Sequence, residues 1–346
     1  MTSVEQYFKS QARSFAAAKE ALNRVVVLIP CHNEEVAVGE TVASFRKALP
    51  EATIYVYDNN SSDRTSAIAC AAGAIVRTEK RQGKGEVVRR MFADIDADIY
   101  VLADGDATYD ASALPNMVAR MRTEQLDFIN GARKSSSVKA YRPGHRLGNA
   151  ALTGMVRMIF GRQFKDMLSG YKVFSRRFVK SFPSMSRGFE IETELTVHAL
   201  ELRMPCVELD TNYFERPTGS FSKLNTFRDG ARIAKLIASL IKNERPLSFF
   251  GLMGAFLILA SVLLAAPLAE TYLQTGLVPR LPTAILAVGL TIVGVFSIFT
   301  GLILDMVTTM RREMKRLHYL SIPLASEAPS HLHGARAVLS LLSSLE

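Results

Sequence analysis

Residues 25–30 read Val25, Val26, Val27, Leu28, Ile29 and Pro30, and this apolar run decides the fold class. A short run without polar alternation predicts a strand that is buried on both faces, as in a parallel sheet. Residues 54–57 and 99–103 show the same pattern. Helical patterns over residues 34–48, 64–72 and 84–94 separate these strands, so strand and helix alternate along the chain. This order predicts βαβ units and an α/β domain with a mostly parallel sheet.

The polar residues that follow each strand are the first candidates for a site, because ligands of such sheets bind at the carboxyl ends of the strands. The sharpest signal is Asp104, Gly105 and Asp106, directly after the strand at 99–103. Two carboxylates at positions i and i+2 of an extended segment point to the same side and suit Mg²⁺ or Mn²⁺. The alternative is a polar turn. An EF-hand is excluded, because Tyr109 stands where its glycine is required.

Two other strand ends carry polar clusters. The first strand ends in the sequence from Pro30 to Glu35, which contains Glu34. The strand at 54–57 is followed by Asp58, which could read a nucleobase, whereas Ser61 to Thr65 fit a helix cap better. No dinucleotide-binding glycine fingerprint and no Walker A motif is present, which counts against dehydrogenases and P-loop enzymes.

The last third of the chain is apolar. Residues 248–269 and 282–307 each reach the length of about 20 residues that crosses a bilayer. The short polar link at 270–281 makes them a predicted transmembrane hairpin. The alternative is a buried helical pair in a soluble protein.

The charge of the chain, +9 with a pI of about 9.5, suggests an anionic membrane surface, phosphorylated ligands or nucleic acid. Basic residues gather on both flanks of the hairpin, while its loop holds only Arg280, so both ends are predicted to be cytoplasmic. Residues 228–242 combine an apolar stripe with a basic face, which predicts an interfacial helix or, alternatively, a helix that packs on the domain. No nucleic-acid-binding motif is found.

The N-terminal segment, residues 3–22, has the pattern of an amphipathic helix that packs on the domain or rests on lipid. It has no signal-peptide pattern, and the three cysteines fit neither a disulfide framework nor a metal site. We therefore expect the first large domain to lie in the cytoplasm, in a multi-pass protein of the cell (inner) membrane. The predicted divisions are 1–24 (helix), 25–227 (α/β domain), 228–247 (interfacial helix), 248–310 (hairpin) and 311–346 (cytoplasmic tail).

Several further motifs appear in a recognisable order: Gly83-Lys84-Gly85, Gly131-Ala132-Arg133, Arg146 to Asn149, Asp166 to Lys172, Phe189 to Glu192 and Arg216 to Lys223. Together with the strand-end clusters, this series resembles family 2 glycosyltransferases of the GT-A fold. It is most similar to polyprenyl-phosphate sugar synthases, the dolichol-phosphate mannose synthase group and its bacterial relatives. The hairpin resembles the branch with two C-terminal spans.

The resemblance implies roles for individual residues. The nucleotide sugar would be held by Pro30, Glu34, Asp58, Lys84 and Asp104, and the metal by Asp104 and Asp106. The catalytic residues would be Asp166, Asp106 and Arg133. The acceptor phosphate would be bound by Arg142, Arg146, Arg216, Ser220 and Lys223. Two residues depart from the family pattern, Lys172 where Arg is frequent and Asn59 where a second Asp is frequent.

The implied reaction is an inverting transfer of a sugar from a nucleotide sugar to polyprenyl phosphate, for use in cell-envelope glycan or lipid modification. Resemblance to bacterial members favours a UDP-sugar and undecaprenyl phosphate, and hairpin-bearing relatives suggest a homo-oligomer. A phosphate acceptor is already ionised at neutral pH, because its second pKa is about 6. Asp166 would then orient a substrate or assist as a base; its structural alternative is a pair with Lys165 or Arg162.

Two other functions stay open. Transfer to another membrane lipid, such as a lipid hydroxyl, would need Asp166 as a true base. A non-catalytic membrane scaffold with a GT-A fold would not bind Mn²⁺ and a nucleotide sugar. A processive polysaccharide synthase is disfavoured, because its Gln-x-x-Arg-Trp motif is missing and the chain has no Trp.

Overall fold

The computed structural model describes residues 24–134, 154, 164–188, 190–217, 239, 242 and 244–323. The chain divides into two compact units, one made of Met1–Leu224 with Leu317–Glu346 and one made of Asn225–Arg316. The predicted helix at 3–22, most of the predicted helix at 228–242 and the tail from residue 324 lie outside the described residues.

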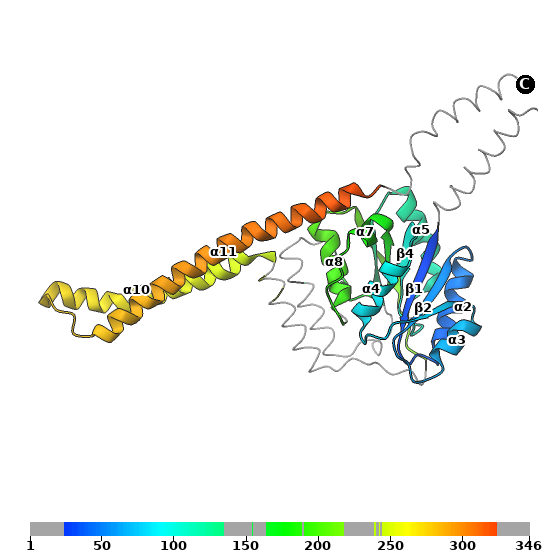
Figure 1. Cartoon of the computed structure of the whole chain (residues 1–346), viewed down its shortest axis with the longest axis horizontal. Helices are drawn as coiled ribbons and strands as arrows, with labels where there is room; N and C mark the ends of the chain where they lie inside the picture. Colours follow the sequence, from blue (N-terminus) through cyan, green and yellow to red (C-terminus); the bar gives the residue numbers. More distant parts are fainter. Residues whose placement is uncertain are drawn as a thin grey trace, which may run out of the picture. The chain divides into compact units, whose positions relative to one another are not determined.

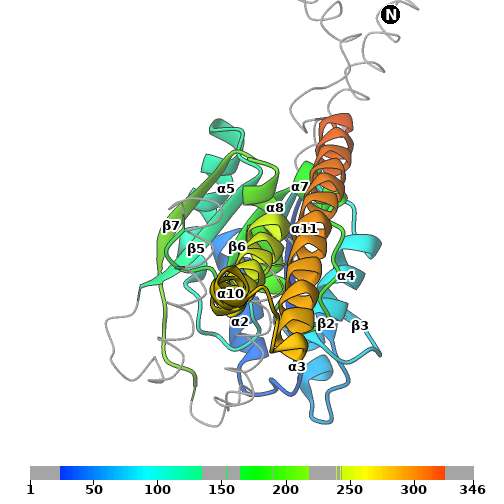
Figure 2. The ribbon, with the colours of Figure 1, turned by 90° about the vertical axis from the view of Figure 1, so that its left-hand side faces the viewer.

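The first unit is built on a seven-stranded sheet with the order β3-β2-β1-β4-β6-β5-β7. Its strands are β1 Val25–Cys31, β2 Thr53–Asp58, β3 Ile75–Thr78, β4 Ile99–Leu102, β5 Phe128–Lys134, β6 Lys172–Ser175 and β7 Cys206–Asn212. β6 runs antiparallel to both of its neighbours, and the other pairs are parallel. Figure 2 shows β7 and β3 at opposite edges of the sheet. The predicted α/β class with a mostly parallel sheet is confirmed.

Helices cover both faces of this sheet (Figure 1). The helices of the first unit are α2 Val38–Ala48, α3 Thr65–Ala71, α4 Lys84–Asp94, the short η1 Ala111–Ala113, α5 Leu114–Thr123, α7 Arg176–Ser181 and α8 Ile191–Glu201. In Figure 1, α2 and α3 lie on one face, and α4, α7 and α8 lie on the other. The predicted helix at 84–94 forms over the same residues, while the helix predicted from residue 34 begins at Val38 after a turn.

The two faces have different cores. Aliphatic residues of α2 and α5, such as Val42 and Met117, pack on the strands, where Val27 and Ile29 are fully buried. The other face is aromatic: Phe174 and Phe178 have ring centroids 4.7 Å apart, and Phe92 contacts Phe174 edge to face. Burial of these side chains is the main force that holds the helices on the sheet and fixes the strand ends in place.

The second unit contains most of two long helices, α10 Pro246–Thr275 and α11 Leu281–Ser321. Both are long and apolar enough to cross a membrane, with mean hydropathies of 2.4 and 2.3 over their most apolar windows. They run side by side (Figure 1) and are tied by short polar contacts, in which Ser261 Oγ donates to the Ala287 carbonyl at 2.5 Å and Ser297 Oγ to the Phe250 carbonyl at 2.8 Å. Most of their large side chains are exposed, as lipid-facing side chains are.

The polar end of this helix pair is closed by a buried carboxylate. Glu244 accepts from Arg312 at 2.7 Å and from Arg311 at 3.3 Å. The helix α11 continues beyond the predicted apolar segment, which ended at Val307, because its charged residues keep good helix propensity after the apolar stretch ends.

Candidate active site

The predicted donor-binding residues meet at one edge of the sheet, because β1, β2 and β4 are parallel and end together. Cys31, next to Pro30, pairs with Asp58 in register, and Leu28 pairs with Leu102 at the end of β4. The segment from Asp104 to Asp106 follows immediately. The strand ends therefore place three of the polar clusters that the sequence singled out along one edge.

Asp104 is joined to a lysine at the start of α4. Lys84 Nζ lies 2.5 Å from Asp104 Oδ1 and 2.5 Å from Glu192 Oε1, and only 7% of the lysine side chain is exposed. Burial alone would lower the pKa of Lys84, but attraction to Asp104 and Glu192 outweighs it and raises this pKa above its ordinary value. Lys84 is therefore a fixed cation beside Asp104.

Glu192 is a site residue to which no role is assigned from the sequence alone. It lies in the first turn of α8, and its pKa is raised by burial and by repulsion from Asp104, against the attraction of Lys84. Glu192 is part of the motif Phe189 to Glu192, but its partner Lys84 lies 108 positions away in the chain. No local pattern reveals a pairing of that range.

Asp106 is the more buried of the two predicted metal ligands, Asp104 and Asp106, with 3% of the residue exposed. Its Oδ1 accepts from Thr108 Oγ1 and its Oδ2 lies near Arg216, both at 2.6 Å. Burial and repulsion from Asp104 raise the pKa of Asp106, and Arg216 opposes the rise. Two carboxylates that repel each other at one edge form a place where a divalent cation would be stabilised, with substrate oxygens completing its ligands.

The close approach of Gly170 shapes this edge as well. A Cβ atom at Gly170 would collide with the carboxylate of Asp104. The Gly170 amide donates to the hydroxyl of Tyr109 at 2.7 Å, which holds the loop against the strand end. Any side chain at this position would displace either the Asp104 carboxylate or the loop.

The predicted catalytic residues Asp166 and Arg133 form one bidentate pair. Arg133 Nε donates to Oδ2 at 2.7 Å, Nη2 donates to Oδ1 at 2.8 Å, and the Arg133 amide adds a third bond at 3.1 Å. Burial would lower the pKa of Arg133, but the hydrogen bonds to Asp166 and its charge hold it well above the ordinary value. Arg133 is thus an ion-pair partner of Asp166 in the structure. Arg162, one of the two partners in the structural alternative, lies outside the described residues.

Asp58 and the loop after β1 are held by local hydrogen bonds. Asp58 accepts from the Ser61 amide at 2.9 Å and from Ser66 Oγ at 2.6 Å. The amide of Glu34 donates to Thr65 Oγ1 at 2.8 Å. The bond from Glu34 to Thr65 ties the loop after β1 to the segment after β2, so Glu34 and Asp58 lie in neighbouring, hydrogen-bonded segments.

Asn59, which departs from the family pattern, braces the loop before α4. Its Nδ2 donates to the carbonyls of Glu79 at 2.8 Å and Arg81 at 2.7 Å, and its Oδ1 accepts from the Gly83 amide at 2.8 Å. Gly83 has a φ of 133°, which side-chain-bearing residues rarely adopt. Asn59 therefore supports the position from which Lys84 reaches Asp104, a role that the sequence did not indicate.

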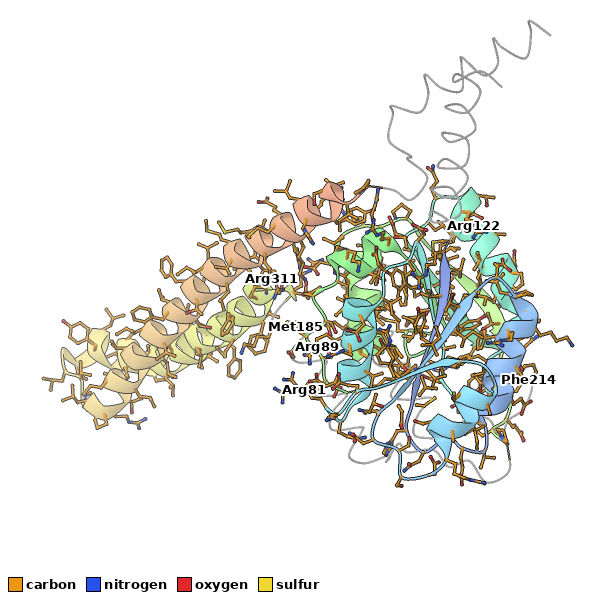
Figure 3. All side chains as sticks on the ribbon, turned by 45° about the vertical axis from the view of Figure 1, so that its right-hand side comes forward. Arg81, Arg89, Arg122, Met185, Phe214 and Arg311 are labelled. Carbon is orange, nitrogen blue, oxygen red and sulfur yellow. The ribbon has the colours of Figure 1, made fainter. Side chains whose placement is uncertain are left out.

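A cleft of about 480 Å³ adjoins Asp104. Its walls come from α2, including Glu40 and Ser44, from the loop after β4 and from Phe214. Figure 3 shows Phe214 on the opposite side of the unit from Arg89 and Met185. The volume lies in the range of about 300–1,000 Å³ that is usual for small-molecule sites.

The predicted acceptor-phosphate residues are only partly described. Arg216 forms an ion pair with Asp106, one of the two predicted metal ligands. Arg142, Arg146, Ser220 and Lys223 lie outside the described residues. Within the part of the chain that is described, no group of three or more His, Cys, Asp or Glu residues could hold a metal. The metal site at Asp104 and Asp106 stays a prediction.

Comparison with known proteins matches this geometry to a family. The model of glycosyl transferase family 2 covers residues 26–182. Glycosyltransferase AglJ of Haloferax volcanii is 30% identical over 303 residues, which cover 86% of this chain and 98% of AglJ. The chain belongs to glycosyltransferase family 2.

Other relatives resemble this glycosyltransferase over shorter stretches. An uncharacterized protein of Shigella flexneri is 55% identical over 155 residues, 45% of this chain and 95% of that protein. A dolichyl-phosphate hexose transferase of Haloferax volcanii is 25% identical over 221 residues, 64% of this chain and 95% of that protein.

Solved structures share the fold of this glycosyltransferase. Glucosyl-3-phosphoglycerate synthase from Mycobacterium tuberculosis, solved with Mn²⁺ and UDP-glucose, aligns with a TM-score of 0.52 and 23% identity. The match covers 65% of this chain and 80% of that chain. The likeness confirms the predicted GT-A class of fold.

Proposed function

We propose that this glycosyltransferase moves a sugar from a nucleotide sugar to a polyprenyl phosphate at a membrane surface. The observation that carries the proposal is the cluster of Asp104, Asp106, Lys84 and Arg216 at the strand ends, in a chain that also holds two membrane-length helices. The dolichyl-phosphate hexose transferase among the relatives supports the acceptor class. The neighbour solved with UDP-glucose supports the donor class.

Asp104 and Asp106 would hold Mg²⁺ or Mn²⁺ together with the donor diphosphate. When bound, the metal would stabilise the charge that grows on the leaving nucleoside diphosphate. Lys84 and Arg216, which pair with these carboxylates in the structure, are cations that would turn to the diphosphate. Pro30, Glu34 and Asp58 would bind the nucleoside.

The transfer step would be a direct displacement. An oxygen of the acceptor phosphate forms a bond to the sugar C1 while the bond from C1 to the diphosphate oxygen breaks, and the electron pair leaves with the nucleoside diphosphate. Configuration at C1 inverts. Arg142, Arg146, Ser220 and Lys223 would contact the acceptor phosphate, whereas Arg216, which was predicted with them, pairs with Asp106 in the structure.

The Asp166–Arg133 pair supports a phosphate acceptor over a hydroxyl acceptor. A carboxylate whose two oxygens are both held by a guanidinium is better suited to orient a neighbour than to take up a proton. A phosphate monoester needs no base, because its second pKa of about 6 leaves it ionised at neutral pH. A lipid hydroxyl would need one.

The membrane helices would hold the lipid acceptor within reach. A polyprenyl chain stays in the bilayer, and its phosphate stays at the interface. An enzyme anchored in the same membrane would therefore meet this phosphate by diffusion along the surface, which favours the encounter. The positive-inside rule would place both ends of the hairpin and the catalytic unit in the cytoplasm.

Sugar transfer to undecaprenyl phosphate tests the proposal. The full chain in detergent or vesicles is supplied with radiolabelled UDP- and GDP-sugars and with Mg²⁺ or Mn²⁺. A lipid-linked product that is lost in Asp104→Ala/Asp106→Ala would support the proposal and identify the donor. Donor binding without transfer to this lipid would point to another lipid acceptor. Failure to bind any nucleotide sugar with Mn²⁺ would favour a non-catalytic scaffold.

A further inference from the structure

Lys172 is a fully buried ammonium in the interior of the catalytic unit, with no exposed surface. Its Nζ donates to Asn130 Oδ1 at 2.7 Å, to Thr196 Oγ1 at 3.1 Å and to the Met167 carbonyl at 3.4 Å. Its hydrogen-bond partners are thus an amide, a hydroxyl and a carbonyl. Burying a charge among neutral groups costs free energy, so packing alone does not explain a lysine at this position.

On one side, these bonds grip the loop that carries Asp166. Asn130 Nδ2 donates to the Asp166 carbonyl at 2.7 Å and to Glu208 Oε1 at 2.9 Å. Glu208 in turn accepts from the Lys165 amide at 2.8 Å and from the Asp166 amide at 3.1 Å. The backbone from Lys165 to Met167 is therefore held on both sides, with Lys172 at the centre.

On the other side, the same ammonium reaches the donor end of the site. Thr196, its hydroxyl partner, donates to the Glu192 carbonyl at 3.1 Å on α8. Glu192 holds Lys84, and Lys84 holds Asp104. A continuous chain of polar contacts thus joins the Asp104 carboxylate to the Asp166–Arg133 pair, and Lys172 is the link in the middle.

We propose that Lys172 is a positioning residue of the glycosyl transfer, which fixes the Asp166–Arg133 pair at a set distance from Asp104 and Lys84. This inference rests on the proposed function and deepens it. Lys172 does not touch either substrate. It acts through Asn130 and the loop at 165–167, so its loss displaces the acceptor side of the site and leaves the donor side intact.

Lys172→Met tests this role, with Lys180→Met as the matched control. Lys180, on α7, is partly exposed and pairs with Asp96. We expect Lys172→Met to lower kcat for sugar transfer about 100-fold, the cost of an ångström-scale misplacement. The donor KM should change less than about threefold, because the donor contacts stay in place. Lys180→Met should behave as the wild type.

Hydrogen exchange separates this inference from the reaction itself. In Lys172→Met, amides of the segment 165–170 should exchange faster, while amides of β4 and α4 keep their protection. This result is expected whichever acceptor the enzyme uses. An inactive wild type would therefore refute the proposed reaction alone, whereas unchanged exchange at 165–170 would overturn the role of Lys172.

Lys172→Arg provides a second measurement if the methionine variant does not fold. Burial lowers the pKa of Lys172 to about 8, with Glu192 and Asp166 opposing the fall and Lys84 and Arg133 adding to it. Glu208 also faces this cluster through Asn130. As the pH rises through about 8, the wild-type ammonium loses its proton and kcat should fall, whereas the arginine variant stays charged and should keep its rate. An identical alkaline fall in both proteins would overturn the proposal.

Discussion

Replacing Asp166 by Asn distinguishes an orienting carboxylate from a catalytic base. Arg133 makes three hydrogen bonds to this carboxylate, two from its guanidinium and one from its amide. Asn can accept through one oxygen only, so at least one charge-assisted bond is lost, which costs about 1.5–3 kcal/mol. If that loss falls on the transition state, kcat drops about 10- to 150-fold at 1.36 kcal/mol per factor of ten.

The assay is steady-state sugar transfer to polyprenyl phosphate, with donor KM and thermal stability measured on the same preparations. Asp96→Asn is the matched control, because Asp96 forms a surface pair with Arg176 and its side chain is 63% exposed. A general base contributes up to about 10⁴-fold. A folded Asp166→Asn with unchanged donor KM and a loss near that limit would refute the orienting role and favour a hydroxyl acceptor.

Three further predictions concern the supports of the site and the helix pair. Asn59→Ala removes three hydrogen bonds that contribute about 1 kcal/mol each. It should therefore lower the melting temperature and raise the donor KM. A stability equal to that of the wild type would contradict the bracing role of Asn59. Glu192→Gln removes the negative charge that shares Lys84 with Asp104, so Lys84 should bind Asp104 more tightly. The Mn²⁺ concentration for half-maximal activity should then rise about tenfold, the worth of one charged hydrogen bond, and an unchanged metal requirement would count against this role. Ser261→Ala should destabilise the detergent-solubilised protein by only about 0.6 kcal/mol, because hydrogen bonds between membrane helices contribute little, and a collapse of the fold would show that this estimate is wrong.

The parts of the fold that the sequence predicted are those with local signals. The strand at 99–103 and the following Asp104 and Asp106 could be identified because an apolar run and its polar end are adjacent in the chain. The helix at 84–94 was equally clear. The antiparallel β6 was not predicted, because it spans only Lys172–Ser175 and its direction depends on the loop that precedes it.

The contacts that define the site could not be predicted, because they join distant positions. Arg133 meets Asp166 across 33 positions and Lys84 meets Glu192 across 108. One pair joins β5 to the loop before β6 and the other joins α4 to α8, and no spacing in the sequence encodes either approach. The role of Lys172, which stands where the family often has Arg, could not be predicted for the same reason. Its side chain lies in the interior and donates to Asn130 and Thr196, which are distant from it in the sequence.

The mass of the lipid product tests the central claim most directly. The purified full chain is incubated with undecaprenyl phosphate, the metal and the nucleotide sugar that it binds, and the lipid fraction is examined by mass spectrometry and ³¹P NMR. We predict a lipid whose mass is that of polyprenyl phosphate plus one glycosyl unit, with the phosphate converted from a monoester to a diester. A sugar attached to a lipid hydroxyl, with the phosphate still a monoester, would contradict this function.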